Sequence, residues 1–221
     1  GLTQQAHEVQ GWLRIPQPDF DVNVDSINGI PFQQRIIANQ KTWLQHSELL
    51  LVCLKSWQVS DAVNALIPHL SADCPILLIH NGMGTLDELT LPETPTKRAI
   101  LQGIITHGAY QQDQKVLHTA EGITHIGPLN TTARQYGYLA EILHQALPDV
   151  AWHNDIHTIS WLKLAVNCVI NPLTVFYQCR NGDLLKYPEH IQKVCDEVYQ
   201  VMEREGVIPT SRSHLHGYII D

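Results

Sequence analysis

Continuous apolar runs alternate with amphipathic segments along the middle of this chain. The runs Leu49–Leu54 and Pro75–Ile79 contain no charged or amide side chain, as expected of strands that are covered on both faces. The amphipathic segment Val59–Leu70 lies between them, and a short helix is predicted to begin at Thr85. This alternation of buried strands and helices predicts an α/β fold with a doubly wound parallel sheet.

Polar residues follow three of the predicted strands. Arg14 ends the strand-like segment Glu8–Arg14, Lys55 follows the first apolar run, and Asn81 follows the second. Because ligands bind at the carboxyl ends of parallel strands, we expect Arg14, Lys55 and Asn81 along one edge of the sheet. The loop His80–Gly84 carries two glycines, which allow the backbone to approach a ligand closely.

The remaining strands and helices of this half are predicted less directly. Asn28-Gly29 lies between two apolar-rich segments and is the signal of a β-hairpin. The predicted strands are Asp21–Val24, Ile30–Ile37, Arg98–Tyr110, Lys115–Ala120, Ile123–Pro128 and Val150–Trp152, and a helix is predicted over Ala133–Leu147.

The pattern becomes helical near Asn154 and stays helical to the end. This change divides the chain into an α/β domain, residues 1–153, and a helical domain, residues 154–221. Asn181-Gly182 is predicted to break the first helix, Pro188–Glu205 forms another, and a last helical turn that buries little begins at Ser211. Gly1–Ala6 resembles the last turns of a helix, and the last helical turn is cut off at Asp221, so we expect both domains to be truncated.

A polar stripe crosses the most apolar of these helices. Lys163, Asn167 and Asn171 are spaced by four, which places them on one helical face, and the residues between them are apolar. Most of the remaining circumference should therefore be buried, with the stripe lining a cleft. A lysine that reaches solvent, with asparagines that bond the backbone, is the alternative. Pro172 disfavours regular helical hydrogen bonding at this point.

Composition excludes several classes of function. The chain has 221 residues, of which 44% are hydrophobic. Its formal net charge of −8 argues against nonspecific nucleic-acid binding. No apolar run approaches the ~20 residues that span a bilayer, so we expect no membrane partner. Five scattered cysteines predict buried, reduced thiols in a cytoplasmic protein. His153 and His157 are spaced by four, but no metal-binding pattern organises the histidines, and no metal is expected.

Five stretches together resemble the ketopantoate reductase (2-dehydropantoate 2-reductase) family from end to end of the chain. They are His7–Arg14, Leu54–Gln58, Ile76–Gly84, Gly122–Gly127 and Lys163–Thr174. The resemblance implies a Rossmann-like domain that binds NADPH, followed by a helical substrate domain. It also implies the reduction of ketopantoate to pantoate in pantothenate and coenzyme A biosynthesis, by a cytoplasmic monomer or homodimer.

The same resemblance assigns roles to individual residues. Lys163 would be the general acid that protonates the C2 carbonyl oxygen as hydride arrives, and Asn167, Asn171 and Asn181 would hold the substrate. Asn81 would lie between cofactor and substrate. The implied cofactor contacts are Arg14 at the 2′-phosphate, Lys55, Gln58, Asn81 and the backbone of Ala109.

Alternatives remain open at each level. Arg14 and Lys55 could be ordinary solvated cations, and Asn81 and Asn181 could serve only to shape turns. The family's glycine-rich phosphate loop and its C-terminal helices are absent from the sequence. The chain could therefore be a truncated, non-catalytic binding or oligomerisation module, or a related reductase that acts on another 2-oxo acid.

Overall fold

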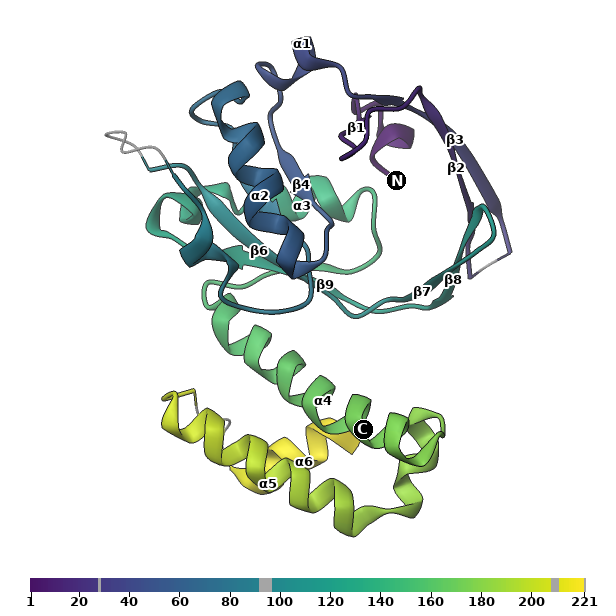
Figure 1. Ribbon diagram of the computed structural model, residues 1–221, viewed down its shortest axis with the longest axis vertical. Coiled ribbons are helices and arrows are strands. Elements are labelled where there is room, and N and C mark those ends of the chain that lie inside the picture. The colour runs from purple at the N-terminus through teal and green to yellow at the C-terminus, as the bar shows by residue number, and fades with distance from the viewer. Residues whose placement is uncertain (28, 92–96, 208–210, 221) are drawn as a thin grey trace. The chain divides into compact units, whose positions relative to one another are not determined.

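The computed structural model describes residues 1–27, 29–91, 97–207 and 211–220, and the chain divides into two compact units (Figure 1). The first unit is Gly1–Ile156 and the second is His157–Asp221. The first contains all the strands that the structure describes, and the second is helical.

The central sheet of the first unit has five strands in the order β10-β9-β6-β5-β4. Strands β4, β5 and β6 are parallel to one another, while β9 runs antiparallel to β6 and parallel to β10. The sheet is therefore mixed, and the predicted parallel arrangement holds for its β4–β6 part. The strands are β4 (Leu50–Val52), β5 (Ile76–Leu78), β6 (Ile100–Ile105), β9 (Thr124–Pro128) and β10 (Val150–Trp152).

Helices cover both faces of this sheet, which confirms the doubly wound prediction (Figure 1). Successive residues of a strand point to opposite faces, so Ile76 and Leu78 of β5 face one way and Leu77 faces the other. Ile76 and Leu78 pack with α2 (Ser56–Leu66) and η2 (Ile67–His69). Leu77 packs with η4 (Thr131–Tyr136) and α3 (Leu139–His144). These last two elements replace the single helix predicted over Ala133–Leu147.

A second sheet has the order β1-β3-β2-β8-β7. Along β2, apolar residues alternate with Asp21, Asn23 and Asp25, so one face is apolar and the other is polar. Strands β2 and β3 are antiparallel, which confirms the hairpin, although Asn28 lies outside the described residues. The strands are β1 (Gln10–Gly11), β2 (Phe20–Asp25), β3 (Pro31–Ala38), β7 (Gly108–Gln112) and β8 (Lys115–Ala120).

The single strand predicted over Arg98–Tyr110 is wrong, because β6 and β7 belong to different sheets. The two residues between them bend the chain by bonding the 122–123 backbone with their side chains. Thr106 Oγ1 accepts the Ile123 N–H at 2.8 Å, and His107 Nδ1 accepts the Gly122 N–H at 3.1 Å. Such side-chain contacts across the sheet boundary leave no simple pattern in the sequence.

The N-terminal residues of the first unit also differ from expectation. Residues Leu2–Gln5 form a 3-10 turn, η1, rather than the end of an α-helix. The predicted strand Glu8–Arg14 is reduced to β1, because the Asn39 side chain accepts the Leu13 N–H at 2.9 Å and removes it from strand pairing. The remaining short elements of this unit are α1 (Lys41–Leu44) and η3 (Thr85–Glu88).

The second unit is built around α4 (Ile156–Tyr177), which continues through Pro172. α4 ends where Gln178 adopts φ of 49° and the Cys179 N–H bonds the Thr174 carbonyl, so the break lies before Asn181. Three shorter elements follow: η5 (Asn181–Lys186), α5 (Pro188–Arg204) and α6 (Arg212–Ile220). The expectation that the last helix buries little is wrong, because Leu215 and Ile219 join the core of this unit.

By length and composition, α4 is also apolar enough to cross a membrane, contrary to the expectation from uninterrupted apolar runs. Core helices of globular proteins have the same composition, and one face of α4 packs in the helical core.

The expectation that the cysteines are buried is wrong in part. Cys74 and Cys195 are buried, and burial raises the pKa of Cys74 to about 11, whereas Cys53 and Cys168 are exposed.

Candidate active site

The loop after β5 is held in a specific conformation by its own side chains and glycines. Gly82 and Gly84 have φ of 112° and 89°, a region that disfavours residues with a Cβ. The His80 ring bonds Thr85 Oγ1 at 2.9 Å through Nε2 and lies 3.3 Å from the Asn81 carbonyl oxygen through Nδ1. Asn81 is exposed at the tip of this loop, within the sequence His80–Gly84 that was predicted to approach a ligand.

The first turn of α2 lies beside this loop. A Cβ on Gly82 would be 3.3 Å from the Ser56 Cβ, so the two backbones are in close contact. Lys55 precedes the helix and is exposed, and Gln58 Oε1 accepts the Lys55 N–H at 3.3 Å. Gln58 therefore closes the helix N-terminus with its carbonyl oxygen, and its amide NH2 is the group that could contact a cofactor.

The structure brings together two of the three residues predicted at one sheet edge. Leu50, Leu51 and Val52 of β4 pair in parallel with residues 76–78 of β5, so Lys55 and Asn81 each follow their strand by three residues at the carboxyl edge. Arg14 does not join them, because β1 pairs with β3 in the other sheet. Ala109 is likewise in that sheet, exposed on β7 at a bulge. The prediction of one shared edge is thus wrong for Arg14.

The polar stripe of α4 lies opposite the packed face of the same helix. Ala165, Val169 and Leu173 form the buried seam and are offset from the stripe by about 160° around the helix axis. Lys163 and Asn167 are half-buried, and Asn171 is exposed. The expectation that most of the circumference is buried is wrong, since Cys168 and Val175 are exposed and several other positions are only half-buried.

Lys163 is a partly buried cation. Partial burial lowers the pKa of its ammonium below the ordinary value of 10.5, because the charged form loses hydration. A lower pKa makes transfer of the proton to a developing alkoxide easier. The stripe ends at Asn171, whose backbone carbonyl accepts the Thr174 hydroxyl at 2.9 Å.

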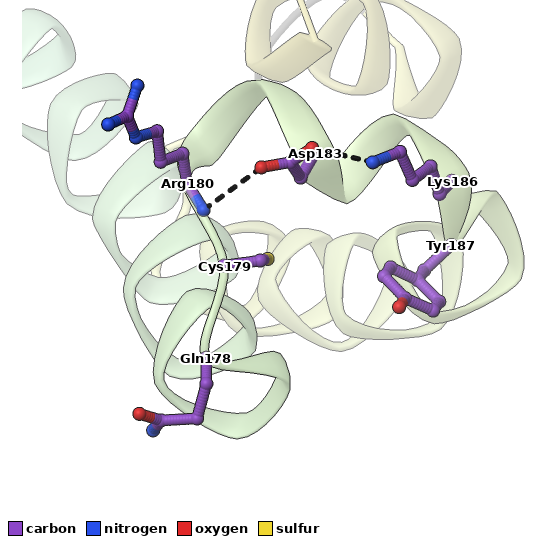
Figure 2. A pocket seen from close by; sticks show the side chains of 6 residues that line it. All are labelled: Gln178, Cys179, Arg180, Asp183, Lys186 and Tyr187. Atoms are coloured by element: carbon purple, nitrogen blue, oxygen red, sulfur yellow. Dashed lines mark hydrogen bonds and ion pairs between the residues drawn. The ribbon is translucent and has the colours of Figure 1, made fainter.

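A hollow of about 550 Å³ lies where α4 gives way to η5 and α5 (Figure 2). Asn181, the first residue of η5, is exposed. Within the hollow, Lys186 donates to Asp183 at 2.7 Å, and the Arg180 backbone N–H bonds the same carboxylate. Both interactions lower the pKa of Asp183. The lining residues are Gln178, Cys179, Arg180, Asp183, Lys186 and Tyr187.

Close packing explains why glycines stand at the two ends of the Gly122–Gly127 stretch. A Cβ on Gly122 would lie 2.5 Å from the Thr106 carbonyl carbon, and one on Gly127 would lie 2.3 Å from the His153 carbonyl oxygen. Both distances are too short for any side chain, so the two glycines allow strands and loops to pack closely. His153 contacts His125 at 2.8 Å, and His157 accepts from the Trp161 ring at 3.1 Å.

Sequence reasoning assigned no role to His80 or Thr85. His80 was seen only as the first residue of a glycine loop, and the spacing to Thr85 matches no simple motif. The described residues contain no group of three or more histidine, cysteine or acidic side chains placed to hold a metal. The expectation of no metal stays a prediction.

Comparison with known families matches nearly the whole chain. Residues 1–131 match the family "Ketopantoate reductase PanE/ApbA" and residues 155–221 match its C-terminal family. A 2-dehydropantoate 2-reductase of Yersinia pestis is 54% identical over 218 residues, which cover 99% of this chain and 70% of the relative. The enzyme of the same name from Vibrio cholerae is 37% identical over 93% of this chain and 69% of the relative.

Solved structures support the fold. A dimeric ketopantoate reductase from Staphylococcus aureus matches with a TM-score of 0.75 at 18% identity, covering 99% of this chain and 78% of the other. D-Mandelate dehydrogenase with NADH and anilino(oxo)acetate also matches with a TM-score of 0.75, at 16% identity over 90% of this chain and 65% of the other. Two-unit chains of this kind therefore share an architecture while their named substrates differ.

Proposed function

The chain belongs to the ketopantoate reductase family, and from this premise we propose that the protein reduces ketopantoate to pantoate with NADPH. This reaction belongs to pantothenate and coenzyme A biosynthesis. The observation that carries the proposal for this chain is the stripe of Lys163, Asn167 and Asn171 on the side of α4 opposite its buried seam. One cation and two amides, separated by apolar residues, match a substrate with a carbonyl, a carboxylate and a hydroxyl group.

Lys163 is proposed to act as the general acid. When bound, the nicotinamide supplies a hydride to the C2 carbon of the substrate. The negative charge that then develops on the C2 oxygen is stabilised by the ammonium, which donates its proton to that oxygen. Asn167, Asn171 and Asn181 are proposed to hold the hydroxyl and carboxylate groups, so that the carbonyl oxygen stays within reach of the Lys163 Nζ.

The α/β unit is proposed to bind the nicotinamide cofactor, and residues 1–153 and 154–221 are proposed as the cofactor and substrate domains. The residues fit such a group, because the glycines of the 80–84 loop expose backbone beside the exposed Lys55 and the first turn of α2. Lys55, Gln58, Asn81 and the Ala109 backbone are the proposed contacts. Arg14 is the proposed partner of the 2′-phosphate that distinguishes NADPH from NADH.

Catalysis can be tested on the purified full-length protein by following NADPH absorbance with ketopantoate and with a panel of other 2-oxo acids. We expect ketopantoate to give the highest kcat/KM and pantoate to appear in equal amount to the NADPH consumed. A higher kcat/KM for another 2-oxo acid would identify a related reductase. NADPH binding without turnover of any of them would favour a non-catalytic module.

Cofactor preference can be tested with a matched pair of arginine variants. Arg14→Ala should lower kcat/KM for NADPH by about 10- to 100-fold and leave that for NADH unchanged, since one charge-assisted contact is lost. Arg35→Ala removes an exposed arginine that pairs with Asp19 and Asp21. This control should leave kcat/KM unchanged for both NADPH and NADH. An equal loss with both cofactors would contradict the role of Arg14.

Location and assembly follow the same reasoning. A reaction between soluble metabolites fits a cytoplasmic protein without nucleic-acid or membrane partners. The similar ketopantoate reductase from Staphylococcus aureus is dimeric, which supports a homodimer, with a monomer as the alternative. Light scattering coupled to gel filtration decides between them.

A further inference from the structure

His80 of the α/β unit makes two hydrogen bonds within its own loop, and the reaction as proposed above gives it no task. Its ring contacts the loop at two points, Asn81 and Thr85, and closes residues 80–85 into a ring. We propose that His80 is a positioning residue that fixes the Asn81 side chain for cofactor and substrate. This inference rests on the proposed function, because Asn81 is a contact in that proposal.

The Asn81 carbonyl determines which ring nitrogen carries the proton. The Asn81 carbonyl oxygen can only accept, so His80 Nδ1 must donate to it across 3.3 Å. In the neutral ring, Nε2 is then an acceptor and receives the Thr85 hydroxyl at 2.9 Å. A protonated ring would donate to both oxygens, so the bridge persists in either charge state.

Thr85 is a firm anchor for this bridge. Its side chain is 7% exposed, and it begins η3 directly after Gly84. On the other side, His80 follows β5, whose three residues are at most 1% exposed. The bridge therefore ties the peptide of Asn81 to two rigid neighbours, one on each side of the glycine loop.

The loop needs such a tether because its glycines do not hold a conformation by themselves. Gly82 and Gly84 populate many backbone conformations in the absence of other contacts. Gly82 is limited on one side by Ser56, and the His80 bridge limits the carbonyl of Asn81 directly. With the 81–82 peptide plane held by the bridge and the other side of Asn81 held by the end of β5, the direction in which the Asn81 side chain leaves the backbone is restricted.

A double-mutant cycle tests the proposal with two readouts, the Kd of NADPH from protein fluorescence and kcat/KM for ketopantoate. His80→Leu should weaken both by about 10- to 100-fold, as expected when a site residue is misplaced by about 1 Å. In an Asn81→Ala background, the same substitution should cost less than about 2-fold, because there is no side chain left to position. An equal loss in both backgrounds, or no loss in Asn81→Ala alone, would overturn the proposal.

Conservative variants separate positioning from a merely structural role. His80→Asn keeps a donor near the position of Nδ1 and should recover most of what His80→Leu loses. Thr85→Ser keeps the hydroxyl and should lose less than Thr85→Val, which keeps the shape without it. If His80→Leu does not fold, the two Thr85 variants still test the bridge. Equal losses within each pair would contradict the bridge.

The two readouts keep this proposal distinct from the proposed function. If NADPH binds but ketopantoate is not reduced, the proposed function fails, and the cycle on NADPH affinity still tests His80. If the substrate is reduced and the cycle is additive, the proposed function stands and the role of His80 is wrong.

Discussion

The stripe on α4 and the loop after β5 carry proposed site residues by different physical means. On α4, a repeat of four in one regular helix places Lys163, Asn167 and Asn171 on one face. In the loop, Asn81 depends on two glycines with positive φ and on a bridge from His80. The helix residues need only local backbone geometry, whereas the loop residue needs contacts with its neighbours.

The stripe and the loop should also differ in how substitutions affect their stability. The seam that packs α4 lies on the side opposite the stripe, so a change in the stripe should affect chemistry and leave stability nearly unchanged. The loop has no such separation, because the groups that hold its shape are adjacent to the proposed contact. Changes there should affect stability and cofactor binding together.

The largest expected effect is on the stripe. Lys163→Ala should lower kcat by about 10²- to 10⁴-fold, the usual contribution of a general acid, with the melting temperature unchanged or raised. Steady-state kinetics with NADPH and ketopantoate measures the loss. Lys193→Ala, which removes an exposed lysine of α5, is the control and should have normal kcat. A kcat of Lys163→Ala within threefold of the normal value would contradict the general-acid role.

The separation of the two faces of α4 can be tested directly. Val169→Ala removes part of a fully buried side chain and should reduce the free energy of unfolding by about 2 kcal/mol. Asn171→Ala, on the exposed face, should change that free energy by less than about 0.5 kcal/mol while raising KM for ketopantoate. Urea denaturation compares the two. Similar losses of stability would show that the stripe is structural.

In the loop, Gly82→Ala should reduce both stability and cofactor affinity. The φ of 112° and the Ser56 side chain at 3.3 Å oppose a Cβ, at a cost of about 1–2 kcal/mol. Gly182→Ala is a matched control, because a Cβ there meets nothing within 4 Å. Thermal melts and NADPH titration measure both effects. Identical behaviour of the two variants would refute the constraint on the loop.

The smallest effect is a pH dependence of stability from Lys163. Its folded pKa is below the unfolded value, so the unfolded state binds more protons between the two pKa values. Stability should therefore rise with pH in the window below 10.5, as the penalty of the partly buried ammonium disappears. Lys163→Met should lack this rise in denaturation curves between neutral pH and that value. Parallel curves for the two proteins would contradict a lowered pKa.

Most of the regular structure was predictable from short stretches. Ile76–Leu78 is apolar on both faces and forms a strand with a neighbour on each side. The bend after Ile105 was not predictable, because Thr106 and His107 are turned by hydrogen bonds to residues 122–123. Local pattern contains no information about such partners.

For the candidate site, the sequence by itself determined the α4 stripe, because 3.6 residues per turn relate positions four apart whatever lies around them. It also determined that Lys55 and Asn81 follow buried strands. Only the tertiary structure decided that these strands are parallel neighbours, that Arg14 follows a strand of another sheet, and that His80 bridges to Thr85. Strand partners and loop contacts join residues far apart in the chain, and their choice depends on the packing of all of them together.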